Sequence, residues 1–126
     1  MVAALSMTAH AADSTLTLAC KGTTTTYLDK RSDPVSLGLL VDFTKRTIKG
    51  FSFFPDKVEE VEITEVTEIV IYFHRATDFL DFGGAIDRLT GEVRGHLESN
   101  KKLMETTHTL SGFDFALKCT PTQRMF

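Results

Sequence analysis

Acidic side chains crowd one short stretch of the sequence, and their spacing could support chemistry. The five glutamates between residues 58 and 70 are Glu59, Glu60, Glu62, Glu65 and Glu68. In an extended strand Glu60 and Glu62 would share one face about 7 Å apart, a separation that suits the paired carboxylates of a glycosidase. Nothing in the surrounding sequence predicts the desolvation that a general acid needs. The stretch therefore indicates a solvated acidic face.

Motifs for metal, nucleophilic or nucleotide chemistry do not occur in the sequence. The histidines His74, His96 and His108 lack the close spacing that makes imidazoles converge on a metal ion. No Gly-x-Ser-x-Gly, Walker or Gly-x-Gly-x-x-Gly pattern is present. The net charge of −3 argues against a nucleic-acid partner, because phosphate binding needs a basic surface. We therefore predict no catalytic residue, no metal ligand and no cofactor.

Asp87, Arg88, Thr90 and Gly91 carry the chemistry of a tight turn. Asp87 and Thr90 can accept hydrogen bonds from the backbone of the turn, and Gly91 can adopt the positive φ that such a turn requires. Arg88 is expected to pair with an acidic neighbour across the strands. These four residues are therefore assigned a structural role.

Phenylalanine is abundant, with ten copies against no tryptophan. A packed core is the default use of these rings. Phe51, Phe53, Phe54 and Phe79 lie near chain breakers, where the mouth of a cavity would be. Because eight-stranded barrels can hold a small ligand, these four are candidates for lining an apolar ligand cavity.

The two cysteines, Cys20 and Cys119, lie near opposite ends of the chain. In an oxidising compartment an even pair predicts a disulfide, and two buried free thiols are the alternative. Period-two alternation over residues 14–20 and 113–119 predicts two half-buried strands with both cysteines on their apolar faces. The bond would then tie the first strand to the last.

Alternation also predicts the strands that lie between these two. Thr23–Thr26 is β-prone but has no apolar face, so it is expected to form an edge strand or a loop. The segment 103–110 is ambiguous between a helical turn and a strand, and we favour a strand. The other predicted strands are 35–43, 46–54, 59–64, 68–74, 84–89 and 92–98.

About seven to nine short strands with tight turns predict an all-β fold, an antiparallel meander. A closed or nearly closed β-barrel is favoured, because a disulfide brings the terminal strands together and closure removes both edges. A two-sheet β-sandwich is the alternative. Antiparallel terminal strands require the first strand to continue to residue 27, so that its threonines pair with 112–118. Parallel neighbours or facing sheets are the other arrangements.

The N-terminus reads as the remnant of a secretory signal peptide. Residues 1–11 contain no Asp, Glu, Lys or Arg and end in Ala9-His10-Ala11, the pattern of signal-peptidase cleavage. Residues 12–126 then form a single β-domain. The apolar stretch is too short to span a membrane. A periplasmic or extracellular address is predicted, with an apolar tail on a cytosolic protein as the alternative.

Several short motifs together resemble a group of small uncharacterised exported proteins of α-proteobacteria. The resemblance implies a secreted β-domain with two paired cysteines, and it implies no function. The motifs, in order, are Leu18-Ala19-Cys20-Lys21-Gly22, Leu40-Val41-Asp42-Phe43, Ile63-Thr64-Glu65-Val66-Thr67-Glu68, Ile86-Asp87-Arg88-Leu89-Thr90-Gly91 and Leu117-Lys118-Cys119-Thr120-Pro121.

Three functional hypotheses follow from these features. The leading one is a non-enzymatic periplasmic module that binds a small apolar ligand or another envelope protein. The second is an interaction or inhibitor protein that acts without a ligand cavity. The third, a hydrolase that uses the acidic residues, has the least support. The oligomeric state is left open.

Overall fold

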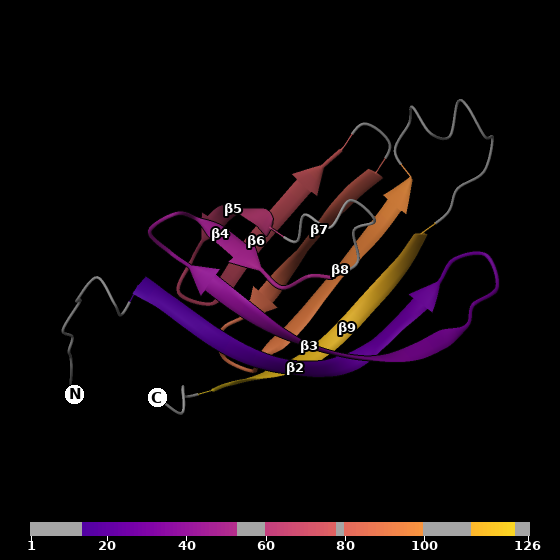
Figure 1. The fold of residues 1–126 in the computed structure, drawn as a ribbon, viewed down its shortest axis with the longest axis horizontal. Helices are drawn as coiled ribbons and strands as arrows, with labels where there is room; N and C mark the ends of the chain where they lie inside the picture. The colour runs from indigo at the N-terminus through magenta and orange to yellow at the C-terminus, as the bar shows by residue number, and fades with distance from the viewer. Residues whose placement is uncertain (1–13, 53–59, 78–79, 100–111, 123–126) are drawn as a thin grey trace.

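The chain forms a closed antiparallel β-barrel. The computed structural model describes residues 14–52, 60–77, 80–99 and 112–122. Within these ranges each strand pairs with the next along the chain, and β2 also pairs with β9 (Figure 1). The predicted all-β barrel is confirmed, and the alternative two-sheet sandwich is not formed. The eight strands are β2 (Thr15–Thr26), β3 (Ser32–Asp42), β4 (Thr47–Lys49), β5 (Glu60–Val66), β6 (Val70–Ala76), β7 (Leu80–Asp87), β8 (Glu92–Ser99) and β9 (Gly112–Pro121).

Alternation sorts the side chains between the barrel interior and solvent. On β5, Val61 and Ile63 are buried, whereas Glu60 and Glu62 are exposed. The same alternation holds along β3, β6 and β9, because successive side chains of a strand point to opposite faces. The interior is therefore apolar, and the acidic stretch lies on the outer wall.

One apolar residue of the predicted buried face points outward instead. Alternation along the predicted strand 68–74 would place Ile69 on the same face as Ile71, but Ile69 is 52% exposed. Thr67 Oγ1 accepts hydrogen bonds from the backbone N–H groups of Ile69 and Val70, at 3.1 and 2.8 Å. This local bonding folds residues 67–69 into a turn, so β6 begins at Val70, two residues later than alternation predicted.

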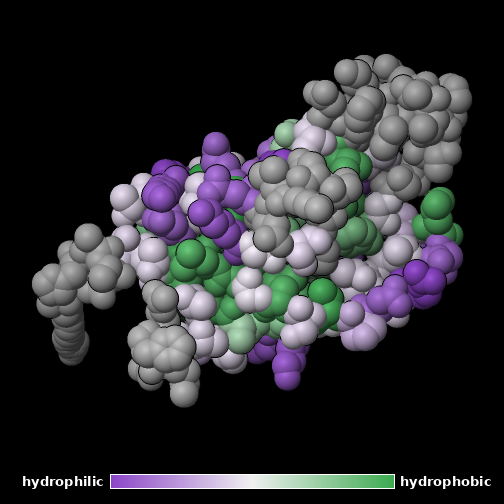
Figure 2. Space-filling model, in the orientation of Figure 1, coloured by the Kyte–Doolittle hydropathy of each residue, from purple (hydrophilic) through white to green (hydrophobic). Residues whose placement is uncertain are grey.

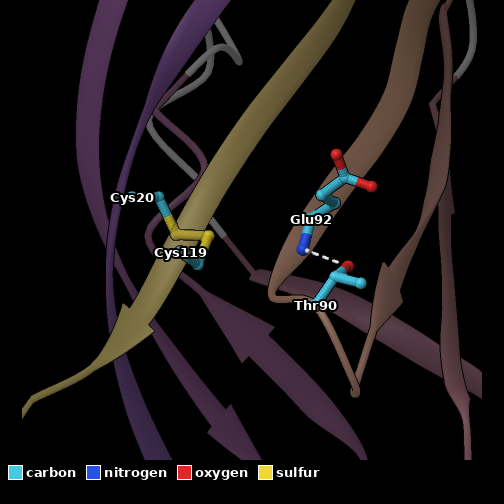
Figure 3. Close-up of a disulfide and its surroundings, with 4 residues drawn as sticks. All are labelled: Cys20, Thr90, Glu92 and Cys119. Atoms are coloured by element: carbon cyan, nitrogen blue, oxygen red, sulfur yellow. Dashed lines mark hydrogen bonds between the residues drawn. A yellow bond between two sulfur atoms is a disulfide. The ribbon is translucent and has the colours of Figure 1, made fainter.

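The disulfide joins the first and last described strands. Cys20 lies directly opposite Cys119 in the register of β2 and β9, and their Cα atoms are 4.1 Å apart (Figure 3). β2 continues past Cys20, so Thr23–Thr26 pair with β9 on one side, and Thr23 to Thr25 pair with β3 on the other. The terminal strands are thus antiparallel neighbours. The prediction that the threonine run forms an edge or a loop is wrong, because pairing on both sides satisfies its backbone.

β4 is shorter than the predicted strand 46–54 because the chain leaves the sheet at Gly50. Gly50 has φ +117°, a conformation that favours glycine. A Cβ at this position would lie 1.9 Å from the carbonyl oxygen of Gly38. The break turns Phe51 into the barrel, where its side chain is 0% exposed.

Four phenylalanine rings fill the middle of the barrel. The Phe51 ring centroid lies 5.0 Å from those of Phe73 and Phe82, and 5.9 Å from that of Phe115. Phe82 and Phe115 stack at 5.4 Å. These separations are those of aromatic rings in contact. Gly95 leaves room for the cluster, since a Cβ there would lie 2.6 Å from the ring of Phe115.

The two ends of the barrel differ in their connections. One end, here called the short-turn end, carries the turns 43–46, 67–69 and 88–91, together with the start of β2 and the end of β9 (Figure 1). The opposite end carries the connections from β2 to β3, β4 to β5, β6 to β7 and β8 to β9. The predicted strand at 103–110 lies outside the described residues. So do residues 1–13, with the predicted signal remnant.

Candidate functional site

A hollow of about 480 Å³ opens at the short-turn end of the barrel. Leu18, Ile71 and Ile86 line it and are at most 5% exposed, so they form its floor. Leu89 lines it too and is 75% exposed, which places this side chain at the rim. Leu16 and Pro121 complete the apolar lining from the start of β2 and the end of β9. In the view of Figure 2, apolar side chains gather at the left and centre of the molecule, with hydrophilic side chains around them.

The turn between β7 and β8 forms one wall of the hollow. Asp87 Oδ1 accepts hydrogen bonds from the backbone N–H groups of Leu89 and Thr90, at 2.8 and 3.0 Å. The N–H group of Gly91 donates to the carbonyl of Asp87 at 2.9 Å. The hydrogen bonds from Thr90 and Leu89 hold the pKa of the Asp87 carboxyl below its usual range. The carboxylate is therefore used to organise the turn.

The same turn is hydrogen-bonded to the backbone of Cys119, one of the two disulfide cysteines. The N–H group of Cys119 donates to the carbonyl of Gly91 at 2.8 Å. Thr90 Oγ1 accepts a hydrogen bond from the N–H group of Glu92 at 3.2 Å, and Figure 3 shows this bond beside the Cys20–Cys119 bridge. The turn that forms the wall of the hollow is thus hydrogen-bonded to β9 at the residue where the disulfide joins β9 to β2.

Gly91→Ala should lower the free energy of unfolding by about 2 kcal/mol or more. Gly91 has φ +82°, and a Cβ there would lie 2.3 Å from the carbonyl oxygen of Cys119. Urea denaturation measures the change. Gly38→Ala is the control, because its Cβ would meet only the Leu18 carbonyl oxygen at 3.7 Å. The control should be neutral or slightly stabilising. Equal losses in both variants would contradict this explanation.

Arg88 makes contacts other than those predicted. An acidic partner across the strands was expected, but the Arg88 guanidinium donates to the carbonyl of Thr67 at 2.6 Å. It also lies over the ring of Phe43, 5.7 Å from the centroid. The reason is position, since Arg88 lies in a turn and reaches the neighbouring turns of the short-turn end.

The structure describes only one of the four phenylalanines that were predicted to line a cavity. Phe51 belongs to the packed ring cluster and does not line the hollow. Phe53, Phe54 and Phe79 lie outside the described residues. The apolar opening that the structure describes at the short-turn end is lined by leucine, isoleucine and proline instead.

His74 and His96 lie close together, although their spacing in the sequence did not predict it. Gly83 on β7 lies opposite His74 on β6 and His96 on β8. A Cβ at Gly83 would lie 3.3 Å from Cδ2 of His74 and 4.0 Å from Cε1 of His96, so both rings lean over the glycine. In the part of the chain that the structure describes, no three His, Cys, Asp or Glu side chains are grouped to bind a metal ion.

A larger groove, of about 660 Å³, lies on the outer wall beside β4, β5 and β6. It contains Glu60 and Glu62 together with Lys45 and Arg46, so its lining holds both acidic and basic groups. Lys49 Nζ lies 3.8 Å from Glu60 Oε2. Because its charged lining is solvated, this groove is a poorer ligand site than the apolar hollow, despite its greater volume.

Comparisons with protein-family models, with curated proteins and with solved structures find no match. No helix within the described ranges has the length and apolar character needed to cross a membrane.

Proposed function

We propose that this protein is a non-enzymatic binding module that takes a small apolar ligand in the hollow at the short-turn end. The observation that carries the proposal is the floor of the hollow, where Leu18, Ile71 and Ile86 of the barrel core face an opening. Its volume of about 480 Å³ falls within the range typical of small-molecule sites. A ligand there would lie against side chains of the barrel core that are themselves almost fully buried.

The middle of the barrel is filled by side chains, so a ligand would have to bind at the short-turn end. The rings of Phe51, Phe73, Phe82 and Phe115 occupy the interior where a lipocalin-like barrel would hold its ligand. Among the described residues, the apolar hollow with a floor of core side chains therefore supports binding best. Any likeness to ligand-binding barrels concerns architecture alone.

An exported, periplasmic address is part of the proposal. The Cys20–Cys119 disulfide is consistent with an oxidising compartment. The Ala9-His10-Ala11 pattern and the resemblance to exported α-proteobacterial proteins support the same address.

Titration with an uncharged fluorescent probe, N-phenyl-1-naphthylamine, tests ligand binding. We expect saturable enhancement with one site per chain. Leu16→Asp/Leu89→Asp should weaken this binding at least about tenfold, because it places charge against the apolar wall. Leu28→Asp is the control, since Leu28 is exposed to a similar degree (71% against 75% for Leu89) and lies at the opposite end. No saturable binding, or an equal loss in the control, would contradict the proposal.

A protein partner is the second candidate, and one observation favours it. Ile69 and Leu89 are both exposed, on neighbouring turns of the short-turn end. The N–H group of Arg88 donates to the carbonyl of Ile69 at 2.6 Å, which holds the two turns together. Native mass spectrometry of protein recovered from a periplasmic extract separates the candidates. A retained small mass supports the ligand, and a stoichiometric protein complex supports the partner.

A further inference from the structure

We propose that the ligand of the hollow is an aliphatic carboxylate, whose head group binds Arg88 and whose chain covers the apolar floor. This inference rests on the proposed function and adds the chemical class of the ligand. It combines an apolar floor with a cation at the rim, two features that together match an amphiphile with one anionic end.

Arg88 supplies a positive charge at the mouth of the hollow, next to the negative charge of Asp87. Asp87 and Arg88 are the two charged residues that line it. Asp87 Oδ1 already accepts two backbone N–H groups within its own turn, so this carboxylate is committed to the structure. Arg88 is exposed, and its charge is not paired with a carboxylate among the contacts described for it. The Arg88 guanidinium is therefore the group that an incoming anion would pair with.

Arg88 is held in place before any ligand arrives. One of its N–H groups donates to the carbonyl of Thr67, and its guanidinium lies over the ring of Phe43. A guanidinium has five N–H donors, so several remain for an anion. Their fork matches the two oxygens of a carboxylate. Because the side chain is already ordered, binding costs little further conformational entropy.

The hollow also sets the direction of the chain. Arg88 and Leu89 lie at the rim, whereas Leu18, Ile71 and Ile86 are buried at the floor. A carboxylate at Arg88 would thus point its alkyl chain toward the core. Each methylene that enters should tighten binding about fourfold until the hollow is full.

The experiment measures dissociation constants for decanoate, decanol and decyltrimethylammonium by displacement of the uncharged probe. We expect decanoate to bind about tenfold more tightly than decanol, and the cation to bind more weakly than decanol. Added salt should weaken decanoate binding and leave decanol binding unchanged, because the interaction with Arg88 is exposed to screening.

Variants of Arg88 separate a binding role from a structural one. Arg88→Met should remove the preference for decanoate and leave decanol binding unchanged, whereas Arg88→Lys should keep part of the preference. Arg94→Met, on the outer wall, is the control and should change neither affinity. Equal binding of decanoate and decanol, or an equal loss of both in Arg88→Met, would overturn this inference while the proposed function stands. Binding of none of the three compounds would overturn the proposed function itself.

Discussion

Replacing both cysteines by serine should lower the melting temperature by about 10–20 °C. Cys20 and Cys119 are separated by 99 positions, so the bond closes nearly the whole described barrel. In the loop-entropy description a bond that closes a loop of this length contributes up to about 4–5 kcal/mol. This is a large share of the roughly 5–15 kcal/mol by which domains are stable. Calorimetry of the wild type and of Cys20→Ser/Cys119→Ser measures the effect.

A reductant provides the control for the cysteine replacement. Treating the wild type should reproduce most of the loss, because reduction removes the bond and leaves both side chains in place. The same treatment should leave the doubly substituted protein unchanged. A wild type whose melting temperature does not respond to full reduction would contradict the stabilising role of the bond.

Phe51→Ala should cost about 3–5 kcal/mol of unfolding free energy. Phe51 is fully buried and touches three other rings, so its removal leaves a void that the surrounding strands cannot close. Phe51→Leu should cost much less, because it keeps most of the buried apolar volume. Chemical denaturation of both variants measures the difference.

Phe43→Ala is the comparison variant, because it removes a ring at the end of the barrel and not in the core. Phe43 is only partly buried at the short-turn end, so its loss should cost less than that of Phe51. A Phe51→Ala variant that keeps wild-type stability but loses probe binding would show that Phe51 lines a ligand cavity after all. That outcome would contradict the filled barrel.

Alternation predicted most of the described strands and their buried faces, but not the outward side chain of Ile69 or the early end of β4. A strand in a closed barrel has one face in the core, so period two appears directly in residues such as Val61 and Ile63. The two cysteines fell on such faces, which is why their pairing could be inferred. The threonine run was misread because its backbone pairs on both sides, which depends on register and leaves no trace in side-chain type.

The burial of Phe51 and the contacts of Arg88 could not be predicted from the local sequence pattern. Gly50 ends β4 with a positive φ, and its backbone passes close to Gly38 on the paired strand β3. Phe51 is therefore buried without belonging to a strand. Arg88 was expected to pair within the sheet, yet the turn carries it to Thr67 and Phe43.

The hollow itself could not be predicted from spacing. Its apolar lining comes from β2, β6, β7 and β9 and the turn after β7, which lie far apart in the sequence and meet only through barrel closure. The histidines beside Gly83 meet in the same way. The chemistry of each residue could be predicted from the sequence. Which residues share a site could not, because that depends on the register of neighbouring strands.

Backbone ¹H–¹⁵N chemical-shift mapping during titration with decanoate tests the ligand site most directly. We expect saturable shifts at the short-turn end, in Leu16, Arg88, Leu89, Gly91 and Thr120, with little change near Leu28 and Phe113 at the opposite end. Saturable shifts confined to the opposite end or to the outer groove beside β5, or no shifts at all, would contradict a ligand site at the short-turn end.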